Sequence, residues 1–275
     1  VVLNGYLFLN IIVGWTSLQY FKNDMTPPKW CKFLAFVSVI WAFSIHTVTA
    51  FLYAGLPGRH YFLTAIMAAR FLASAFCSGP AILLLLILFL RRLTGFDPGK
   101  KAINRLAVII TYAMCVNIFF FLLEVFTAFY SNIPGHMGSI VYLFVGEHGH
   151  SELVPWMWSF AAMAVLSLAL LVPPALRDNH KLLPYSLAIL VAATWIDKGL
   201  GLLIGGFNPN VYEGISPYWP TGPELLISLM VYATGALVVT ILFKIATDVK
   251  AELGVSQKLP CGCSTDDHCD CAKAA

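Results

Sequence analysis

Residues 44–80 read SIHTVTAFLYAGLPGRHYFLTAIMAARFLASAFCSGP, and this stretch decides the fold class. Two ionisable side chains, His46 and Arg70, lie in surroundings that are otherwise apolar enough for lipid, on either side of a short turn at 55–60. An ionisable side chain within a membrane is costly and therefore needs a structural or functional reason. The stretch predicts two membrane-spanning helices, each with a polar group at depth.

The composition of the whole chain agrees with this prediction. Of its 275 residues, 59% are hydrophobic and only 11% are charged, and the mean hydropathy is +0.78. An ordinary soluble domain has about 25% charged residues. We therefore expect an all-α protein, a polytopic helical bundle in a membrane. The net charge of +3 does not point to nucleic acid, because in a membrane protein the positions of Lys and Arg carry the information.

Seven apolar runs are about 18 residues or longer, which is enough to cross a bilayer. They lie at 1–21, 32–56, 61–90, 105–130, 153–176, 182–206 and 223–247. We expect residues 1–250 to form the bundle and residues 251–275 to form a cytoplasmic tail. The chain begins without Met, so we also expect further N-terminal residues and spans to precede it.

The tail is rich in cysteine. Two Cys-x-Cys pairs, Cys261 with Cys263 and Cys269 with Cys271, lie within eleven residues and beside His268. These thiols could bind a soft metal, or they could be reduced thiols on a disordered tail. Both interpretations stay open, and we assign no metal ligands in the chain.

The basic residues predict the orientation. If alternate connections share one side of the membrane, 14 of the 17 Lys and Arg fall on that side, and the opposite side receives only Arg59. Cytoplasmic loops carry the excess of Lys and Arg. We therefore expect a multi-pass protein of the cytoplasmic membrane with its C-terminus in the cytoplasm. Loops 57–60, 131–152 and 207–222 would lie outside, the last two as an ordered, lid-like extension with solvated His and Glu side chains.

Four ionisable residues within the spans are predicted to lie at one depth. A rise of about 1.5 Å per residue places His46, Arg70, Glu124 and Asp197 about 10–15 Å from the outer ends of their helices. Helical spacing adds further polar positions to the same faces, including Tyr53 and Asn117.

Lys198 directly follows Asp197 in the sixth predicted span. Neighbours on a helix point about 100° apart, so we expect Lys198 to pair with a residue of another helix instead.

The polar layer has two interpretations. Its charges could only hold helices in register, or they could form a pocket or a proton path. His46 is the only histidine within a span, so a haem held by two His ligands within this chain is not expected. No set of Cys in the spans has the spacing of cluster ligands, so an iron–sulfur cluster is not expected either. An imidazole suits hydrogen bonding and proton exchange. An apolar slot with polar contacts and a proton acceptor favours a quinone as ligand.

Several motifs resemble one family. HTVTAF at 46–51, GLPGRHYFLTAIMAARFLASAFCSGP at 55–80, the run from Asn117 to Ser131 and WIDKGLGLLIGGF at 195–207 are similar to the NrfD/polysulfide-reductase membrane subunits. Within that family they resemble the DsrP-like branch, the quinone-interacting subunit of the sulfite-reduction-associated DsrMKJOP complex. The resemblance covers residues 1 to about 250. Members generally have eight to ten spans.

The resemblance implies a function in a respiratory complex. The chain would exchange electrons between membrane menaquinone and a periplasmic ferredoxin-like iron–sulfur subunit, beside a multihaem cytochrome c and other membrane subunits. It would be the quinone-reactive subunit of an oxidoreductase and not act alone. The candidate catalytic residues are His46, Glu124 and Asp197. The candidate quinone-pocket residues are His46, Tyr53, Arg70, Asn117 and Glu124.

The sequence leaves two other functions open. A proton-conducting or transporter-like subunit would need a polar path through the inner half of the bundle, where the sequence offers scattered Ser, Thr and Tyr. A structural anchor for extrinsic redox subunits would leave the polar layer without a ligand.

Overall fold

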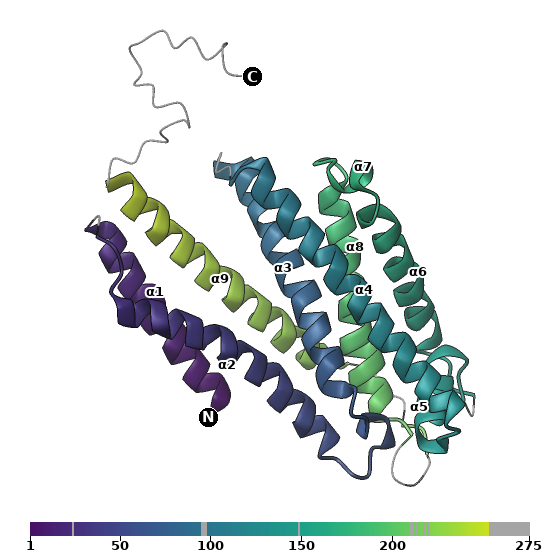
Figure 1. Ribbon diagram of the computed structural model, residues 1–275. Coiled ribbons are helices and arrows are strands. Elements are labelled where there is room, and N and C mark those ends of the chain that lie inside the picture. Colours follow the sequence, from purple (N-terminus) through teal and green to yellow (C-terminus); the bar gives the residue numbers. More distant parts are fainter. Residues whose placement is uncertain are drawn as a thin grey trace. The chain divides into compact units, whose positions relative to one another are not determined.

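The computed structural model describes residues 1–23, 25–94, 98–147, 149–209, 212, 214–216, 218 and 220–252. These residues form helices and connecting turns and contain no named strand, which confirms the predicted all-α class (Figure 1). The cysteine-rich tail lies outside the described residues, so the two interpretations of it stay predictions.

The chain divides into two compact units. Unit 1 comprises Val1–Ala42 and Trp219–Ala275, and unit 2 comprises Phe43–Tyr218. The helical elements in chain order are α1 (Val2–Lys22), α2 (Lys29–Ala54), η1 (His60–Phe62), α3 (Met67–Thr94), α4 (Lys100–Tyr130), α5 (Pro134–Phe144), α6 (Val154–Leu171), α7 (Pro174–Arg177), α8 (Leu183–Trp195), η2 (Ile196–Ile204) and α9 (Gly222–Glu252). Helix α2 contributes its first half to unit 1 and its second half to unit 2.

Six of the seven predicted spans are long and apolar enough to cross a membrane. These are α2, α3, α4, α6, α8 with η2, and α9. The remaining predicted span, 1–21, forms α1, which has the length of a span but carries more polar residues, among them Asn4, Asn10 and Gln19. Helix α3 continues through Pro80 to Thr94.

In unit 1, the beginning of α1 packs against the middle of α2. The indole Nε1 of Trp41 donates to the carbonyl of Val2 at 3.1 Å, and a Cβ on Gly5 would lie 2.7 Å from the Trp41 ring. Glycine at position 5 therefore allows α2 to approach α1 closely. Helix α9 exposes its apolar side chains along its length.

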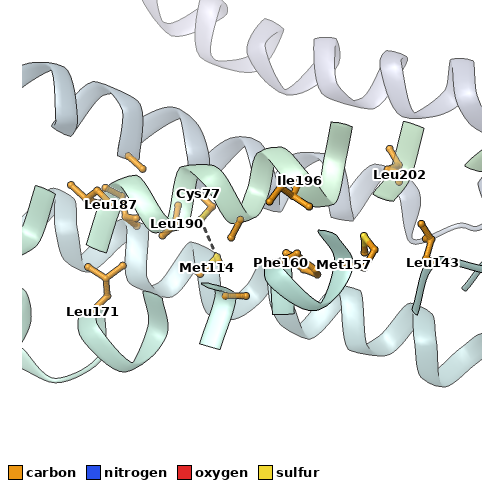
Figure 2. Packing of buried hydrophobic residues seen from close by; sticks show 14 of the residues in the cluster. Cys77, Met114, Leu143, Met157, Phe160, Leu171, Leu187, Leu190, Ile196 and Leu202 are labelled. Atoms are coloured by element: carbon orange, nitrogen blue, oxygen red, sulfur yellow. Dashed lines mark hydrogen bonds between the residues drawn. The ribbon is translucent and has the colours of Figure 1, made fainter. Parts of the chain in front are cut away.

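The core of unit 2 lies where α3, α4, α6 and α8 run side by side (Figure 1). Apolar side chains fill this region along the length of the helices, from Leu171 and Leu187 near one end to Leu143 and Leu202 near the other (Figure 2). Such close packing fixes how the helices lie against each other.

Glycines in and after η2 allow the closest contacts of this core. A Cβ on Gly205 would lie 2.6 Å from the Leu143 side chain, and one on Gly201 would lie 2.9 Å from Met157. Small residues at these positions therefore allow the backbone after α8 to approach α5 and α6 closely.

One end of unit 2 carries the basic residues and the other carries η1 and α5 (Figure 1). We call the end formed by the last turn of α3, the first turn of α4 and the α7 region the basic end. We call the opposite end, which matches the predicted outer loops, the outer end.

Candidate functional site

Arg70 is the centre of a buried charged cluster in unit 2. Its Nη1 atom donates a hydrogen bond to Oε2 of Glu124 on α4, and its Nη2 atom donates to Oδ1 of Asp197 on η2 at 2.8 Å. All three side chains are buried, with exposed fractions of 1–3%. Of the four ionisable residues predicted to lie at one depth, Arg70, Glu124 and Asp197 therefore meet. We call Arg70, Glu124, Asp197 and Lys198 the charged cluster.

Asp197 and Lys198 lie on a π-helical segment, η2, which continues α8. The Nζ atom of Lys198 lies 3.2 Å from Oδ2 of Asp197 and 5.6 Å from the centre of the Phe71 ring on α3. The expectation that Lys198 pairs with another helix instead of Asp197 is thus wrong. A long, flexible side chain folds back to its neighbour and still covers an aromatic ring of α3.

The charged cluster is electrically balanced. Two cations, Arg70 and Lys198, face two carboxylates, Glu124 and Asp197, and the Arg70 guanidinium also lies over the Phe121 ring at 5.3 Å. Burial of charge is tolerated only where the charges pair and their hydrogen bonds are satisfied. π-Helical segments within α-helices are frequent at functional sites, since they redirect side chains.

Some polar atoms near the cluster lack a partner. Among the described residues, the buried oxygen atoms Glu124 Oε1 and Asn117 Oδ1 accept no hydrogen bond. Asn117 and Glu124 lie seven residues apart on α4, so they share one face of that helix. Buried acceptors of this kind are rare unless a water or a ligand supplies the donor. Asn117 and Glu124 thus leave acceptor capacity in the core for such a group.

His46 lies apart from the ion pairs. It is half-buried on α2, and within the described part of the chain no ion pair or hydrogen bond joins it to the charged cluster. It shares a helix face with Phe43, whose ring packs 5.3 Å from that of Phe76 on α3, and with buried Ala50. That face of α2 turns toward α3, as the predicted polar stripe requires.

Tyr53 connects this face of α2 to a cavity at the outer end. The cavity has a volume of about 580 Å³ and is lined by Tyr53, Arg59, Leu203, Ile204, Phe207, Asn208, Ser216 and Tyr218. The Tyr53 ring lies 5.8 Å from the Phe71 ring, and Phe71 in turn lies beneath Lys198. Phe71 therefore contacts both Tyr53 of the cavity wall and Lys198 of the charged cluster.

The outer end is held by hydrogen bonds to the segment after η2. Arg59 donates to the carbonyl of Phe207 at 2.7 Å and lies over that ring at 5.1 Å. Ser139 of α5 donates to the carbonyl of Asn208 at 3.0 Å, and the Asn208 side chain accepts from the backbone of Ser216 at 2.9 Å. These contacts order one wall of the cavity.

The predicted outer loop 131–152 is partly helical. Residues Pro134–Phe144 form α5, and His136 is buried against Tyr61 and the backbone of Leu63. The prediction of a solvated loop is thus wrong at His136, because Gly135 lets the His60 side chain pack on the helix. Burial lowers the pKa of His136, and the nearby His60 lowers it further.

The remaining charges of this loop are placed differently. His150 lies 3.2 Å from Glu152, and both are solvent-accessible, as predicted. His148 lies outside the described residues. Within the described ranges, no three His, Cys, Asp or Glu side chains come together as a metal site.

The sequence of this chain also matches a known protein family. The family described as "Polysulphide reductase, NrfD" matches this chain over residues 5–208. The chain belongs to the NrfD family. The matched range holds the whole charged cluster, Tyr53, Asn117 and His46, so the NrfD match includes every candidate site residue.

A curated relative of this NrfD protein is a dimethyl sulfoxide reductase membrane subunit from Halobacterium salinarum. It is 23% identical over 238 residues, which cover 79% of this chain and 53% of the relative. The chain thus spans about half the length of that relative. Family and fold together identify a multi-pass membrane protein of the NrfD family.

Sequence reasoning missed two parts of the site. The π-helical geometry of η2 has no signal in an apolar pattern with period 3.6, although the glycines at 199, 201, 205 and 206 mark an irregular segment. Phe71, which lies between the cavity and Lys198, follows Arg70 and reads as an ordinary apolar residue.

Proposed function

We propose that this NrfD protein is the quinone-reactive subunit of its redox complex, exchanging electrons between membrane menaquinone and an iron–sulfur subunit on the outer face. One observation carries the proposal. The same aromatic side chain, Phe71, contacts Tyr53, which lines an apolar cavity, and Lys198, which belongs to a buried cluster with two carboxylates.

The cavity suits a ring with an apolar tail. Its volume of about 580 Å³ lies in the range of about 300–1,000 Å³ that is usual for small-molecule sites. Tyr53, Phe207 and Tyr218 present aromatic surface, on which a planar ring can stack. Its place at the end of the spans lets a lipid-soluble molecule reach it from the bilayer.

The charged cluster supplies the polar contacts. An ammonium group has three N–H donors, and Lys198 lies near one carboxylate oxygen, Asp197 Oδ2, so donors remain for a carbonyl oxygen of a ligand. Glu124 keeps one oxygen atom without a partner among the described residues. When bound, a quinone supplies two-electron, two-proton chemistry, and its oxygen atoms need hydrogen-bond partners of both kinds.

Proton exchange falls to two side chains of this chain. His46 is half-buried, carries no ion pair among the described residues, and has the side chain best suited to gain and lose a proton near neutral pH. Glu124 can accept a proton at Oε1 without losing its bond from Arg70 through Oε2. Asp197, which bonds both cations, has the role of holding Arg70 and Lys198 in place.

The partner subunits belong to the outer end in this proposal. The turn at 55–60 and the segment after η2 cover the cavity there, and Arg59 fixes them to each other. The positive-inside rule puts the basic end and the C-terminus in the cytoplasm. The DsrP-like resemblance extends the proposal to sulfur metabolism, with a multihaem cytochrome c as a further partner.

A proton-conducting subunit is the less favoured alternative. The core between the charged cluster and the basic end is filled by apolar side chains such as Cys77, Met114 and Leu190 (Figure 2). The hydroxyl groups of Thr111 and Ser186 donate to carbonyls of their own helices. Hydroxyls bonded in this way do not form a chain for protons across the described part of the core.

The test uses the purified complex with a soluble quinol as reductant. His46→Gln removes the exchangeable imidazole without unbalancing the charged cluster, so we expect at least about a tenfold fall in quinol-dependent reduction of the partner with assembly intact. Thr47→Val is the matched control, because among the described residues the Thr47 hydroxyl donates only to the Phe43 carbonyl of its own helix. Equal turnover of the two variants would remove His46 from the site.

A further inference from the structure

A second cavity lies at the basic end of unit 2, away from the candidate quinone site. Its volume is about 420 Å³, and it opens between the first turns of α4 and the connection from α6 to α8. The lining residues are Asn104, Arg105, Val108, Ile109, Arg177 and Asp178. The cavity therefore combines two guanidinium groups with an apolar wall.

Its polar groups are only partly satisfied. Arg177 donates from Nη1 to the carbonyl of Leu171 at 3.4 Å, and its Nε atom lies 3.8 Å from Asp178 Oδ1, too far for a hydrogen bond. In the described part of the chain, the buried atoms Arg177 Nε and Asn104 Oδ1 have no hydrogen-bond partner. Both atoms leave hydrogen-bonding capacity at the cavity, and Arg177 also brings a charge to it.

The charges favour an anion. Arg105 and Arg177 outnumber the one carboxylate of the lining, Asp178, and the exposed lysines at 100, 101 and 181 stand close by in the sequence. A guanidinium binds phosphate oxygens through two parallel N–H donors, and such charge-assisted bonds are stronger than neutral ones. A phosphodiester fits this rim.

The apolar wall identifies the rest of the ligand. Val108 and Ile109 lie about one helical turn further into the span of α4 than Asn104 and Arg105, and Ile109 is exposed. A group that is anionic at the helix end and hydrocarbon one turn deeper has the chemistry of a phospholipid. Basic pockets between spans at a membrane surface bind anionic lipid head groups.

We propose that Arg105 and Arg177 form a binding site for the phosphate of an anionic membrane phospholipid, whose acyl chain lies along Val108 and Ile109. The site joins the start of α4 to the α6–α8 connection, so the lipid bridges two parts of the bundle that the sequence separates. It does not depend on quinone chemistry, because the charged cluster and the outer cavity share no residue with it.

The experiment measures lipid retention by the purified protein. Native mass spectrometry after exchange into detergent with added phosphatidylglycerol or phosphatidylcholine counts the lipids bound to wild type and to Arg105→Gln/Arg177→Gln. We expect selective binding of phosphatidylglycerol by the wild type and binding about tenfold weaker in the double variant. The control, Lys100→Gln/Lys101→Gln, removes two charges from the same end outside the cavity lining and should bind as the wild type does.

Three results would overturn the proposal. The first is an equal loss of phosphatidylglycerol binding in the double variant and in the lysine control. The second is equal binding of the two lipids by the wild type. The third is full displacement of the lipid by glycerol phosphate, which would make the site a soluble-phosphate site. If the double variant does not fold, Arg105→Gln alone decides, because Arg105 is exposed. Unchanged phosphatidylglycerol binding in that single variant would contradict the assignment.

Discussion

The Nη2 atom of Arg70 lies 2.8 Å from Oδ1 of Asp197, 127 residues further along the chain. This bond joins α3 to the π-helical segment η2 in the core of unit 2, and the second bond of Arg70, to Glu124, adds α4. Of these three elements, η2 also contributes Leu203 and Ile204 to the lining of the outer cavity. One set of ion pairs thus fixes the helices and provides a polar group with unused hydrogen-bonding capacity.

Removal of one charge from the cluster should destabilise the fold. Glu124→Gln keeps the size of the side chain but leaves two buried cations against one carboxylate, so we expect a loss of about 3–5 kcal/mol. Thermal unfolding in detergent measures this loss. Glu152→Gln is the control, because Glu152 is exposed and pairs only with His150 among the described residues. Equal unfolding temperatures for the two variants would show that the cluster is not a stabilising ion network.

Tyr53 should affect ligand binding more than assembly. Tyr53→Ala removes an aromatic wall of the outer cavity and the contact with Phe71, so the KM for quinol should rise about tenfold. Tyr112→Ala is the control, because the Tyr112 ring is 71% exposed on α4 and is not among the residues that line the outer cavity. Steady-state kinetics of the assembled complex measure the KM for quinol of both variants. An unchanged KM in Tyr53→Ala would exclude this cavity as the binding site.

Gly205 should tolerate no side chain. Gly205→Ala places a Cβ 2.6 Å from the buried Leu143 side chain, so this side chain or the backbone beside it must shift, at a cost of about 1–3 kcal/mol. Gly138→Ala on α5 is the matched substitution, because a Cβ there meets nothing within 4 Å. The difference between their unfolding temperatures measures the effect. A Gly205→Ala protein as stable as Gly138→Ala would contradict the close approach.

The outer end should loosen in acid. Burial lowers the pKa of His136 below its ordinary value of 6.5, so the folded state holds this proton less tightly than the unfolded chain does. Stability from the neutral ring is therefore complete above about pH 6.5 and is lost as the pH falls toward the lower folded pKa.

Hydrogen exchange of the α5 amides at about pH 7.5 and about pH 5.5, on either side of the ordinary histidine pKa, tests this expectation. Protection of α5 should fall at the lower pH in the wild type and change much less in His136→Gln, which cannot become charged. The same pH response in both proteins would assign the effect to other groups.

The sequence predicts the charged cluster because each of its members is an expensive residue within an apolar run. Helix rise alone places Arg70, Glu124 and Asp197 at similar depths, and the structure brings them into contact. The same reasoning places His46 at that depth but cannot tell which way a half-buried side chain on α2 points. The helical period and the depth in the membrane predict which residues form a layer, whereas the contacts within that layer depend on side-chain packing.

The outer end was less predictable. Helix α5 is only 11 residues long and begins at Pro134, so its apolar pattern is too short to separate from a loop. The burial of His136 depends on η1, which comes from a turn far earlier in the chain. Contacts between two short connecting segments leave no periodic signal in either.

Quinone binding in the outer cavity, between Tyr53 and the charged cluster, is the main proposal for this NrfD protein. A structure of the assembled complex with a bound menaquinone analogue tests it most directly. The ring should pack against Tyr53, with one of its oxygen atoms within hydrogen-bond distance of Lys198 or His46. An analogue bound elsewhere, with the cavity filled by lipid and the charged cluster out of its reach, would exclude this cavity as the quinone site.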